Sequence, residues 1–327
     1  MTMDARAQDT LRKHSKSFHW AGRFLSRDEL DKGARLYRIC RQVDDWADNA
    51  HTREESRQAH RRLMALHDSI SVEQDGSADP ITLSRDDTRQ LADLRADTRD
   101  LFGADPAACQ AMRDLLLTMV KDLSLVSIDD DAALLDYAYG AAGTVGVMMC
   151  HCLKAREIEL ARRFAIDMGM AMQMTNIARD VLEDAQRGRL YLPRTWMMRD
   201  VTAEAICQGD TDARHEAWAA VKTLVAYAEP YYASGLKGLA YLPPRPRLAI
   251  AVACRVYRDI GRRILRMEDT RYWASRVTVP TMGKASQSLL ALAQVPLKET
   301  HPTHDSRLHE ALNTRLSPLR GLRDTTP

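Results

Sequence analysis

Helical periodicity runs through almost the whole of this 327-residue sequence, and no segment shows the apolar–polar alternation of a β-strand. Several periodic stretches begin with a residue that can cap a helix. Ser26 and Glu29 have the spacing of a capping box, and Asp105 followed by Pro106 is typical of a helix start. We therefore predict an all-α protein.

The periodic stretches predict at least eight helices. They are expected at about 27–49, 53–70, 85–101, 107–126, 130–152, 155–185, 211–241 with a bend near Pro230, and 245–266. Turn-rich breaks are expected at 71–84, 187–193 and 242–246. Because the candidate site below needs residues from both halves of the chain, we expect one helical domain over 1–296. The polar residues near the end predict a poorly ordered tail over 297–327.

Charge and hydropathy exclude several classes of protein. Lys and Arg number 47 and Asp and Glu 45, so no broad basic field is available for a nucleic acid. The longest near-continuous apolar stretch, 140–150, is shorter than the roughly 20 residues of a membrane-spanning helix. The beginning, MTMDARAQDT, has no apolar core and does not resemble a secretory signal. We expect a cytoplasmic protein.

Two stripes of oxygen-bearing side chains each follow one face of a predicted helix. Within each stripe the members are three or four residues apart, which is the spacing of a single helical face. Apolar neighbours such as Met174 and Ile177 indicate that the second stripe is not simply the wet side of a helix. The stripes are Tyr37, Arg41, Asp44 and Asp48, and Gln173, Asn176, Asp180 and Asp184.

Carboxylates spaced in this way repel one another, and burying them without partners costs still more, so the stripes favour bound cations. Mg²⁺ takes oxygen ligands and is commonly held by one or two carboxylates together with substrate phosphates. Facing stripes of this kind can hold metal ions that grip a diphosphate and promote ionisation of a C–O bond. A single acidic stripe in a chain with 28% charged residues is ordinarily a solvated face. Because both stripes have the same spacing and an adjacent arginine, a functional role is favoured over a pair of solvated faces.

Five segments in the order seen here form a recognisable set. They are His14–Phe18, Cys40–Asp48, Tyr137–Gly146, Asn176–Asp184 with Arg187–Pro193, and Arg276–Pro280. In these segments the sequence resembles the head-to-head trans-isoprenyl diphosphate synthases, a family that comprises phytoene, dehydrosqualene and squalene synthases. The resemblance extends from residue 14 to about 290. The most specific segment is Asn-x-x-Arg-Asp-x-x-Glu-Asp followed by Arg-Gly-Arg-x-Tyr-Leu-Pro.

The resemblance implies a single helical barrel of the isoprenoid synthase type, whose apolar cavity holds two prenyl diphosphates. It implies Mg²⁺, with Mn²⁺ as a possible substitute, bound by Asp44, Asp48, Asn176, Asp180 and Asp184. The implied diphosphate contacts are Ser15, Ser17, Arg41, Arg179, Tyr257, Arg276 and Lys284. Tyr137 is expected near the reacting carbons, and the implied catalytic set is Tyr137, Arg41, Arg179 and Tyr257.

The implied reaction condenses two geranylgeranyl diphosphates head to head, through a cyclopropyl diphosphate, to phytoene, with loss of diphosphate and without NADPH. The glycine pattern of 137–146 resembles phytoene and dehydrosqualene synthases, so a dehydrosqualene or squalene synthase acting on two farnesyl diphosphates stays open. A non-catalytic prenyl-binding scaffold is a second alternative. Because the product is so oily, we expect peripheral association with a membrane. The oligomeric state is left open.

Overall fold

A computed structural model describes residues 5–70, 84–124, 126–294 and 301–316, and in these ranges the only strand-like pairing is one parallel bridge between Ser127 and Leu190. The α-helices are α1 (Ala5–His14), α2 (Lys16–Ala21), α3 (Arg27–Asp48), α4 (Arg53–Ser69), α5 (Arg85–Phe102), α6 (Pro106–Lys121), α7 (Asp131–Ala138), α8 (Thr144–Cys152), α9 (Ile158–Gln186), α10 (Ala203–Gln208), α11 (Thr211–Tyr227), α12 (Glu229–Gly238), α13 (Pro244–Leu265), α14 (Asp269–Ala274), α15 (Thr281–Gln294) and α16 (Asn313–Leu316). Short 3-10 helices are η1 (Gly22–Phe24), η3 (Arg194–Trp196), η4 (Leu239–Tyr241) and η5 (Ser306–Leu312), and η2 (Tyr139–Gly143) is a π-helical segment. The predicted all-α class is confirmed.

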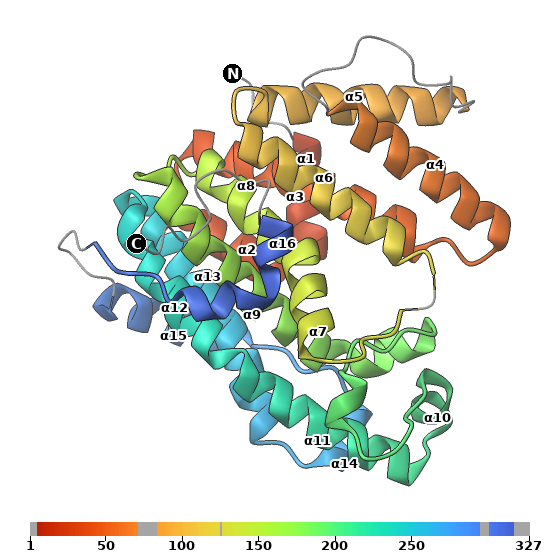
Figure 1. The fold of residues 1–327 in the computed structure, drawn as a ribbon. Coiled ribbons are helices and arrows are strands. Elements are labelled where there is room, and N and C mark those ends of the chain that lie inside the picture. Colours follow the sequence, from red (N-terminus) through yellow and green to blue (C-terminus); the bar gives the residue numbers. More distant parts are fainter. Residues whose placement is uncertain (1–4, 71–83, 125, 295–300, 317–327) are drawn as a thin grey trace.

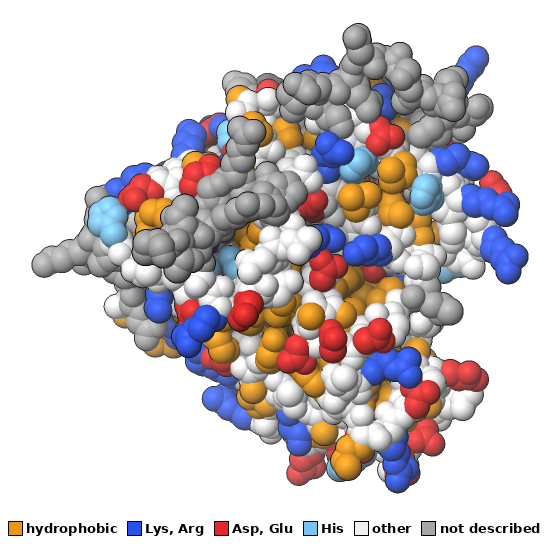
Figure 2. All heavy atoms as spheres, viewed as in Figure 1, with side chains coloured by type: hydrophobic (Ala, Val, Ile, Leu, Met, Phe, Trp, Pro, Cys, Tyr) orange, Lys and Arg blue, Asp and Glu red, His pale blue; other side chains and the backbone are white. Residues whose placement is uncertain are grey.

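The long helix α9 runs through the middle of the molecule (Figure 1). It contacts α7, α8, α10, α11, α12 and α13, and its buried side chains include Met170, Met174 and Ile177. On the face drawn in Figure 2, both acidic and basic side chains lie among hydrophobic ones. No helix within the described residues is long and apolar enough to cross a bilayer.

Local signals placed most helices to within a few residues. Ser26 and Thr52 both form the reciprocal hydrogen bonds of a capping box, at the starts of α3 and α4. Asp105 caps α6, which has Pro106 in its first turn. Pro230 lies in the first turn of α12, directly after α11 ends, so the predicted bend at this proline is present. The break predicted at 71–84 lies outside the described residues, apart from Ser84, which caps α5.

The predicted helix at 130–152 is interrupted by the π-helical segment η2, and the one at 107–126 ends at Lys121. Close packing of α8 on α9 accompanies the interruption. A Cβ atom on Gly146 would lie 2.1 Å from the carbonyl oxygen of Ala165, and one on Gly169 would lie 2.2 Å from that of Ala142. Only glycine allows the two backbones to come this close.

Residues 301–316 differ from the sequence-based expectation of a poorly ordered tail, because they form η5 and α16. The fully buried carboxylate of Asp167 on α9 holds this segment. It accepts a hydrogen bond from Ser234 at 2.5 Å and lies 2.9 Å from Nε2 of His304 and 2.8 Å from Nε2 of His309. These contacts join positions that are 137 and 142 residues apart, which no local pattern could reveal. Residues 317–327 lie outside the described part of the chain.

We expect His309→Ala to lower the free energy of unfolding by about 1–3 kcal/mol, because it leaves a buried carboxylate one hydrogen bond short. Denaturant unfolding followed by circular dichroism measures the change. The matched control is His301→Ala: the His301 side chain is 75% exposed and pairs with Glu157 at the surface, so its loss should change stability by less than about 0.5 kcal/mol. Equal effects of the two variants would contradict the anchoring role of Asp167.

Candidate functional site

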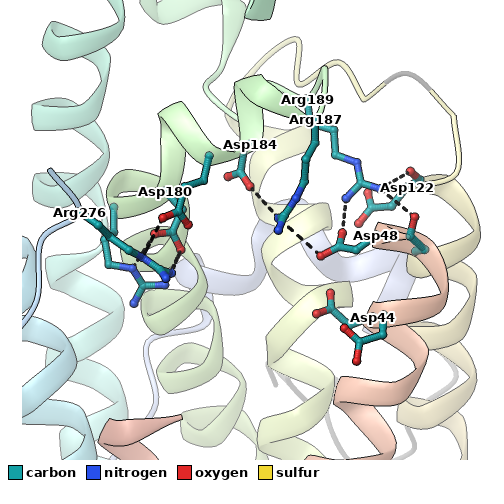
Figure 3. A network of polar contacts seen from close by, with 12 residues as sticks. Asp44, Asp48, Asp122, Asp180, Asp184, Arg187, Arg189 and Arg276 are labelled. Carbon is teal, nitrogen blue, oxygen red and sulfur yellow. Dashed lines mark hydrogen bonds and ion pairs between the residues drawn. The ribbon is translucent and has the colours of Figure 1, made fainter. Parts of the chain in front are cut away.

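The ends of α3 and α9 bring the two oxygen-bearing stripes face to face (Figure 3). A single guanidinium nitrogen of Arg187 lies 3.6 Å from a carboxylate oxygen of Asp48 on α3 and 4.0 Å from one of Asp184 on α9. The two stripes therefore share the space that this cation spans. Arg187 follows α9 in a turn at Gly188, whose φ of 74° is in the left-handed region that suits glycine.

Arg189 ties this turn to the end of α3. Its guanidinium forms an ion pair with Asp48 and donates to the backbone oxygens of Ala47 at 3.1 Å and Asp122 at 3.2 Å. The Arg-Gly-Arg sequence after the second stripe thus places two positive charges between the stripes. Both arginines lie in the Arg-Gly-Arg-x-Tyr-Leu-Pro motif, but neither is among the site residues expected from the sequence.

Asp180, on the second stripe, accepts hydrogen bonds from two arginines. Nε of Arg179 donates at 2.7 Å, and Nε and Nη2 of Arg276, in the segment between α14 and α15, each donate at 2.9 Å. On the first stripe, Arg41 pairs with Asp44 at 2.8 Å and with Asp45 at 2.5 Å. Arg41, Arg179 and Arg276, all expected to bind diphosphate, therefore surround the stripes.

Burial makes the negative charge of the stripes costly. Burial, with the neighbouring Asp48, raises the pKa of Asp44 to about 6. Burial, with the neighbouring Asp180, raises the pKa of Asp184 to about 8. In such a place a bound cation would lower both pKa values and favour the charged carboxylates.

The donor set fits a hard cation such as Mg²⁺. All five expected ligands offer oxygen, and among the residues that the structure describes Oδ1 of Asn176 is buried without a hydrogen-bond partner. The stripes are not a preformed cage. Across the described ranges, the one group of three His, Cys, Asp or Glu ligand atoms within 4.8 Å of one another is Asp167, His304 and His309. Mg²⁺ usually keeps several waters and shares substrate phosphates, so it does not need converged protein ligands.

The Asp167 cluster is already a complete hydrogen-bond network. Its carboxylate has three donors at 2.5 to 2.9 Å, and the hydrogen bonds to His304 and His309 hold the pKa of Asp167 below its ordinary value although burial opposes this. This geometry explains the cluster as the anchor of the C-terminal segment without an ion.

An apolar cavity of about 390 Å³ opens from the first stripe into the helical core. Its polar residues include Arg41, Asp44, Gln173 and Asn176, and the rest of its wall is mainly apolar. The apolar wall comes from α2, α3, α8, α9 and α13 and includes Phe18, Leu36, Val145, Gly146, Met168, Met172, Ile250 and Ala253. A ligand with an anionic head and a hydrocarbon tail matches this division.

Two tyrosines of the expected catalytic set line the cavity. The hydroxyl of Tyr137 donates to Asp122 at 3.2 Å, and its ring stacks on Tyr191 with centroids 4.6 Å apart. Burial raises the pKa of Tyr137 well above its ordinary value and that of Asp122 to about 7. Tyr257 is also buried, with its ring centroid 5.3 Å from that of Phe18. Asp122 and Tyr191 were not among the expected site residues, because their contacts with Tyr137 depend on tertiary structure.

The cavity wall does not include the other three expected diphosphate contacts, Ser15, Ser17 and Lys284, although Ser15 hydrogen-bonds the wall residue Tyr257. Ser15 is the N-cap of α2 and accepts the backbone N–H of Phe18 at 3.2 Å. Ser17 on α2 and Lys284 on α15 are half-buried, and neither lines the cavity. Burial and the nearby Lys16 lower the pKa of Lys284. The structure thus brings Arg41, Arg179 and Arg276 against the stripes and Tyr257 into the cavity wall, and the places of Ser17 and Lys284 at the diphosphate stay a prediction.

The arrangement of helices and cavity defines an isoprenoid synthase fold. It matches a solved dehydrosqualene synthase in complex with a ligand, at a TM-score of 0.65 and 24% sequence identity, over 88% of this chain and 95% of that one. Residues 11–283 match the model of the squalene/phytoene synthase family. The chain belongs to this family, and the resemblance seen in its motifs is confirmed.

Two curated relatives are similar over most of their length. The 15-cis-phytoene synthase of Paracoccus sp. (strain N81106 / MBIC 01143) is 33% identical over 87% of this chain and 88% of its own. The 15-cis-phytoene synthase of Pantoea ananas is 30% identical over 92% of this chain and 96% of its own.

We expect Asp184→Asn to stabilise the metal-free protein at high pH. The pKa of Asp184 is about 8 in the folded protein against an ordinary 3.8, so its protonated form favours folding at low pH and that advantage is lost as the pH rises through about 8. The amide should raise the free energy of unfolding by about 1–3 kcal/mol near pH 8.5 and leave it unchanged near pH 4. Denaturant unfolding in chelator at both pH values checks this.

The control for this experiment is Asp200→Asn, since the Asp200 side chain is 73% exposed and pairs with Arg194 at the surface. It should change stability by less than about 0.5 kcal/mol at either pH. If Asp184→Asn instead lowered the free energy of unfolding at high pH, burial of the charged Asp184 carboxylate would not be costly, contrary to the explanation of its raised pKa.

Proposed function

We propose that this protein is a Mg²⁺-dependent phytoene synthase that condenses two geranylgeranyl diphosphates head to head, through a cyclopropyl diphosphate, and releases diphosphate without using NADPH. The observation that carries the proposal is the facing pair of stripes, crossed by Arg187, beside an apolar cavity. The names of the relatives in Paracoccus and Pantoea support the same reaction. The intact stripes argue against a non-catalytic scaffold.

The proposed metal ligands are Asp44, Asp48, Asn176, Asp180 and Asp184. Mg²⁺, for which Mn²⁺ is the expected substitute, would neutralise the departing diphosphate when bound. The raised pKa values of Asp44 and Asp184 and the unpartnered oxygen of Asn176 support this assignment.

The proposed diphosphate contacts are Arg41, Arg179 and Arg276, with Ser15, Ser17, Tyr257 and Lys284 from the sequence resemblance. A guanidinium is permanently charged and can donate to two phosphate oxygens at once. These arginines pair with Asp44 and Asp180, so their guanidinium groups point toward the stripes. Arg187 and Arg189 add positive charge at the same place.

The cavity wall is proposed to protect a carbocation from water. Met168 and Met172 present soft apolar surface along α9, and the backbone of Gly146 adds to the same wall. Tyr137, with its hydroxyl held by Asp122 and its ring stacked on Tyr191, is proposed to lie beside the reacting carbons.

The second candidate is a synthase that acts on two farnesyl diphosphates. The structural match to a dehydrosqualene synthase favours it, as does 29% identity to the 4,4'-diapophytoene synthase of Staphylococcus haemolyticus over 76% of this chain. Both candidates use the same ionisation chemistry, and they differ in the length of the substrate.

Purified protein with Mg²⁺ and geranylgeranyl diphosphate should release a C40 hydrocarbon in the absence of NADPH. Chromatography with mass spectrometry of the extracted product is the measurement, with farnesyl diphosphate and added NADPH as parallel reactions. Turnover of the C15 substrate alone would replace the main proposal with the second candidate. A strict need for NADPH would indicate a squalene synthase.

Replacing Asp44 or Asp180 with Asn should lower kcat by at least about 100-fold, since each change removes a charge that holds the metal beside the leaving group. Helical circular dichroism should stay unchanged, and Asp200→Asn serves as the surface control. Full turnover by either site variant would contradict the metal assignment.

We further propose that the protein works in the cytoplasm at the surface of a membrane. The substrates are amphiphiles and the product is a hydrocarbon, so both favour a lipid phase over water. Association of this kind needs only a surface that binds the bilayer, not a spanning helix.

A further inference from the structure

The outward face of α15 is apolar, which is the reverse of an ordinary surface helix. Met282 is 83% exposed, Leu289 68%, Leu292 56% and Leu290 44%. These four make up half of the large hydrophobic side chains that are exposed in the described part of the chain. Three of them, Met282, Leu289 and Leu292, lie seven and three residues apart and so share one helical face.

Polar contacts fix α15 in this orientation. Its inner face carries Ser288, which accepts a hydrogen bond from the indole N–H of Trp20 at 3.0 Å, and Gln287, whose side-chain oxygen accepts from Nε of Arg255 on α13 at 3.2 Å. Because these bonds hold the polar side against the protein, the helix cannot turn to bury its leucines. We call the outward side chains of Met282, Leu289, Leu290 and Leu292 the α15 ridge.

Positive charge lies beside the start of α15. The ammonium of the exposed Lys16 on α2 lies close enough to Lys284 to lower the pKa of Lys284, which shares the inner face with Gln287 and Ser288. Nη2 of Arg263, whose Nε pairs with Asp259 at 2.7 Å, lies 3.1 Å from where a Cβ of Gly283 would be. The sequence of α15 contains no Asp or Glu. Anionic groups are therefore the natural partners around the ridge.

The ridge lies one helix away from the substrate cavity. α15 packs on α13, which supplies Ile250, Ala253 and Tyr257 to the cavity wall. Trp20, which bonds α15, is two residues from Phe18, another wall residue. A surface that binds lipid here would bring the bilayer close to the cavity.

We propose that the α15 ridge docks on the surface of an anionic lipid bilayer, with its leucines and methionine among the acyl chains and the neighbouring Lys16 and Arg263 at the phosphates. The inference identifies the surface behind the membrane association proposed above and rests on that proposal. A bilayer offers acyl chains to the apolar ridge and negative phosphates to the cations beside it. A second copy of the chain would bring the same positive charges together, so it is disfavoured.

Flotation of the full-length protein with vesicles tests the proposal. Vesicles of phosphatidylcholine with phosphatidylglycerol are compared with phosphatidylcholine alone, at low and high salt. The wild type should float with the anionic vesicles. The bound fraction should fall at high salt, because salt screens the positive charges beside the ridge. The double variant Leu289→Gln/Leu292→Gln should reduce the bound fraction at least about tenfold. The control Leu160→Gln/Met198→Gln changes two exposed apolar side chains elsewhere and should bind like the wild type.

A second readout separates this proposal from the proposed enzyme activity. The ridge variant should keep turnover of geranylgeranyl diphosphate dispersed in detergent, and Asp180→Asn should lose turnover but still float. No binding of the wild type to either vesicle, or equal binding of the wild type and the ridge variant, would overturn the docking surface. The proposal would also be overturned if light scattering showed a dimer that the ridge variant dissociates, while flotation of the variant stayed unchanged.

Discussion

Mutual repulsion between acidic side chains on α3 and α9 is the constraint on which the site depends. Asp44, Asp48, Asp180 and Asp184 lie in partly buried surroundings, where each raises the cost of charging its neighbours. Arginines offset this repulsion, and one of them, Arg187, contacts both stripes. A metal–diphosphate complex carries both signs of charge, so it can replace these internal pairs without leaving the site unbalanced.

Much of this site could be predicted from the sequence because its two halves are local. The spacing of three and four residues along one helix is enough to align Asp44 with Asp48 and Asp180 with Asp184. The capping box at Ser26 likewise fixes where the first of these helices begins. Hence the all-α class and the acidic stripes both follow from patterns that span less than one helix.

The contacts between distant segments could not be predicted in this way. Arg189 and Asp48 are 141 residues apart, and the partner of Tyr137 is an aspartate at the end of another helix. The motif that contains Arg187 and Arg189 marked their importance, but only the folded turn at Gly188 shows which carboxylates they meet. The π-helical segment at Tyr139–Gly143 was missed for the same reason, since it accompanies close packing of α8 against α9.

The clamp at Asp167 bears on how the protein can be trimmed or tagged. The sequence suggests residue 296 as a natural end, yet a chain shortened there would lose His304 and His309 and leave a dry, charged carboxylate inside the molecule. That carboxylate is adjacent in sequence to Met168, whose side chain packs on Gly235 and lines the cavity. An affinity tag is therefore safer at the amino end. Chains that end before Leu316 are expected to disturb the apolar cavity through Asp167 and the adjacent Met168.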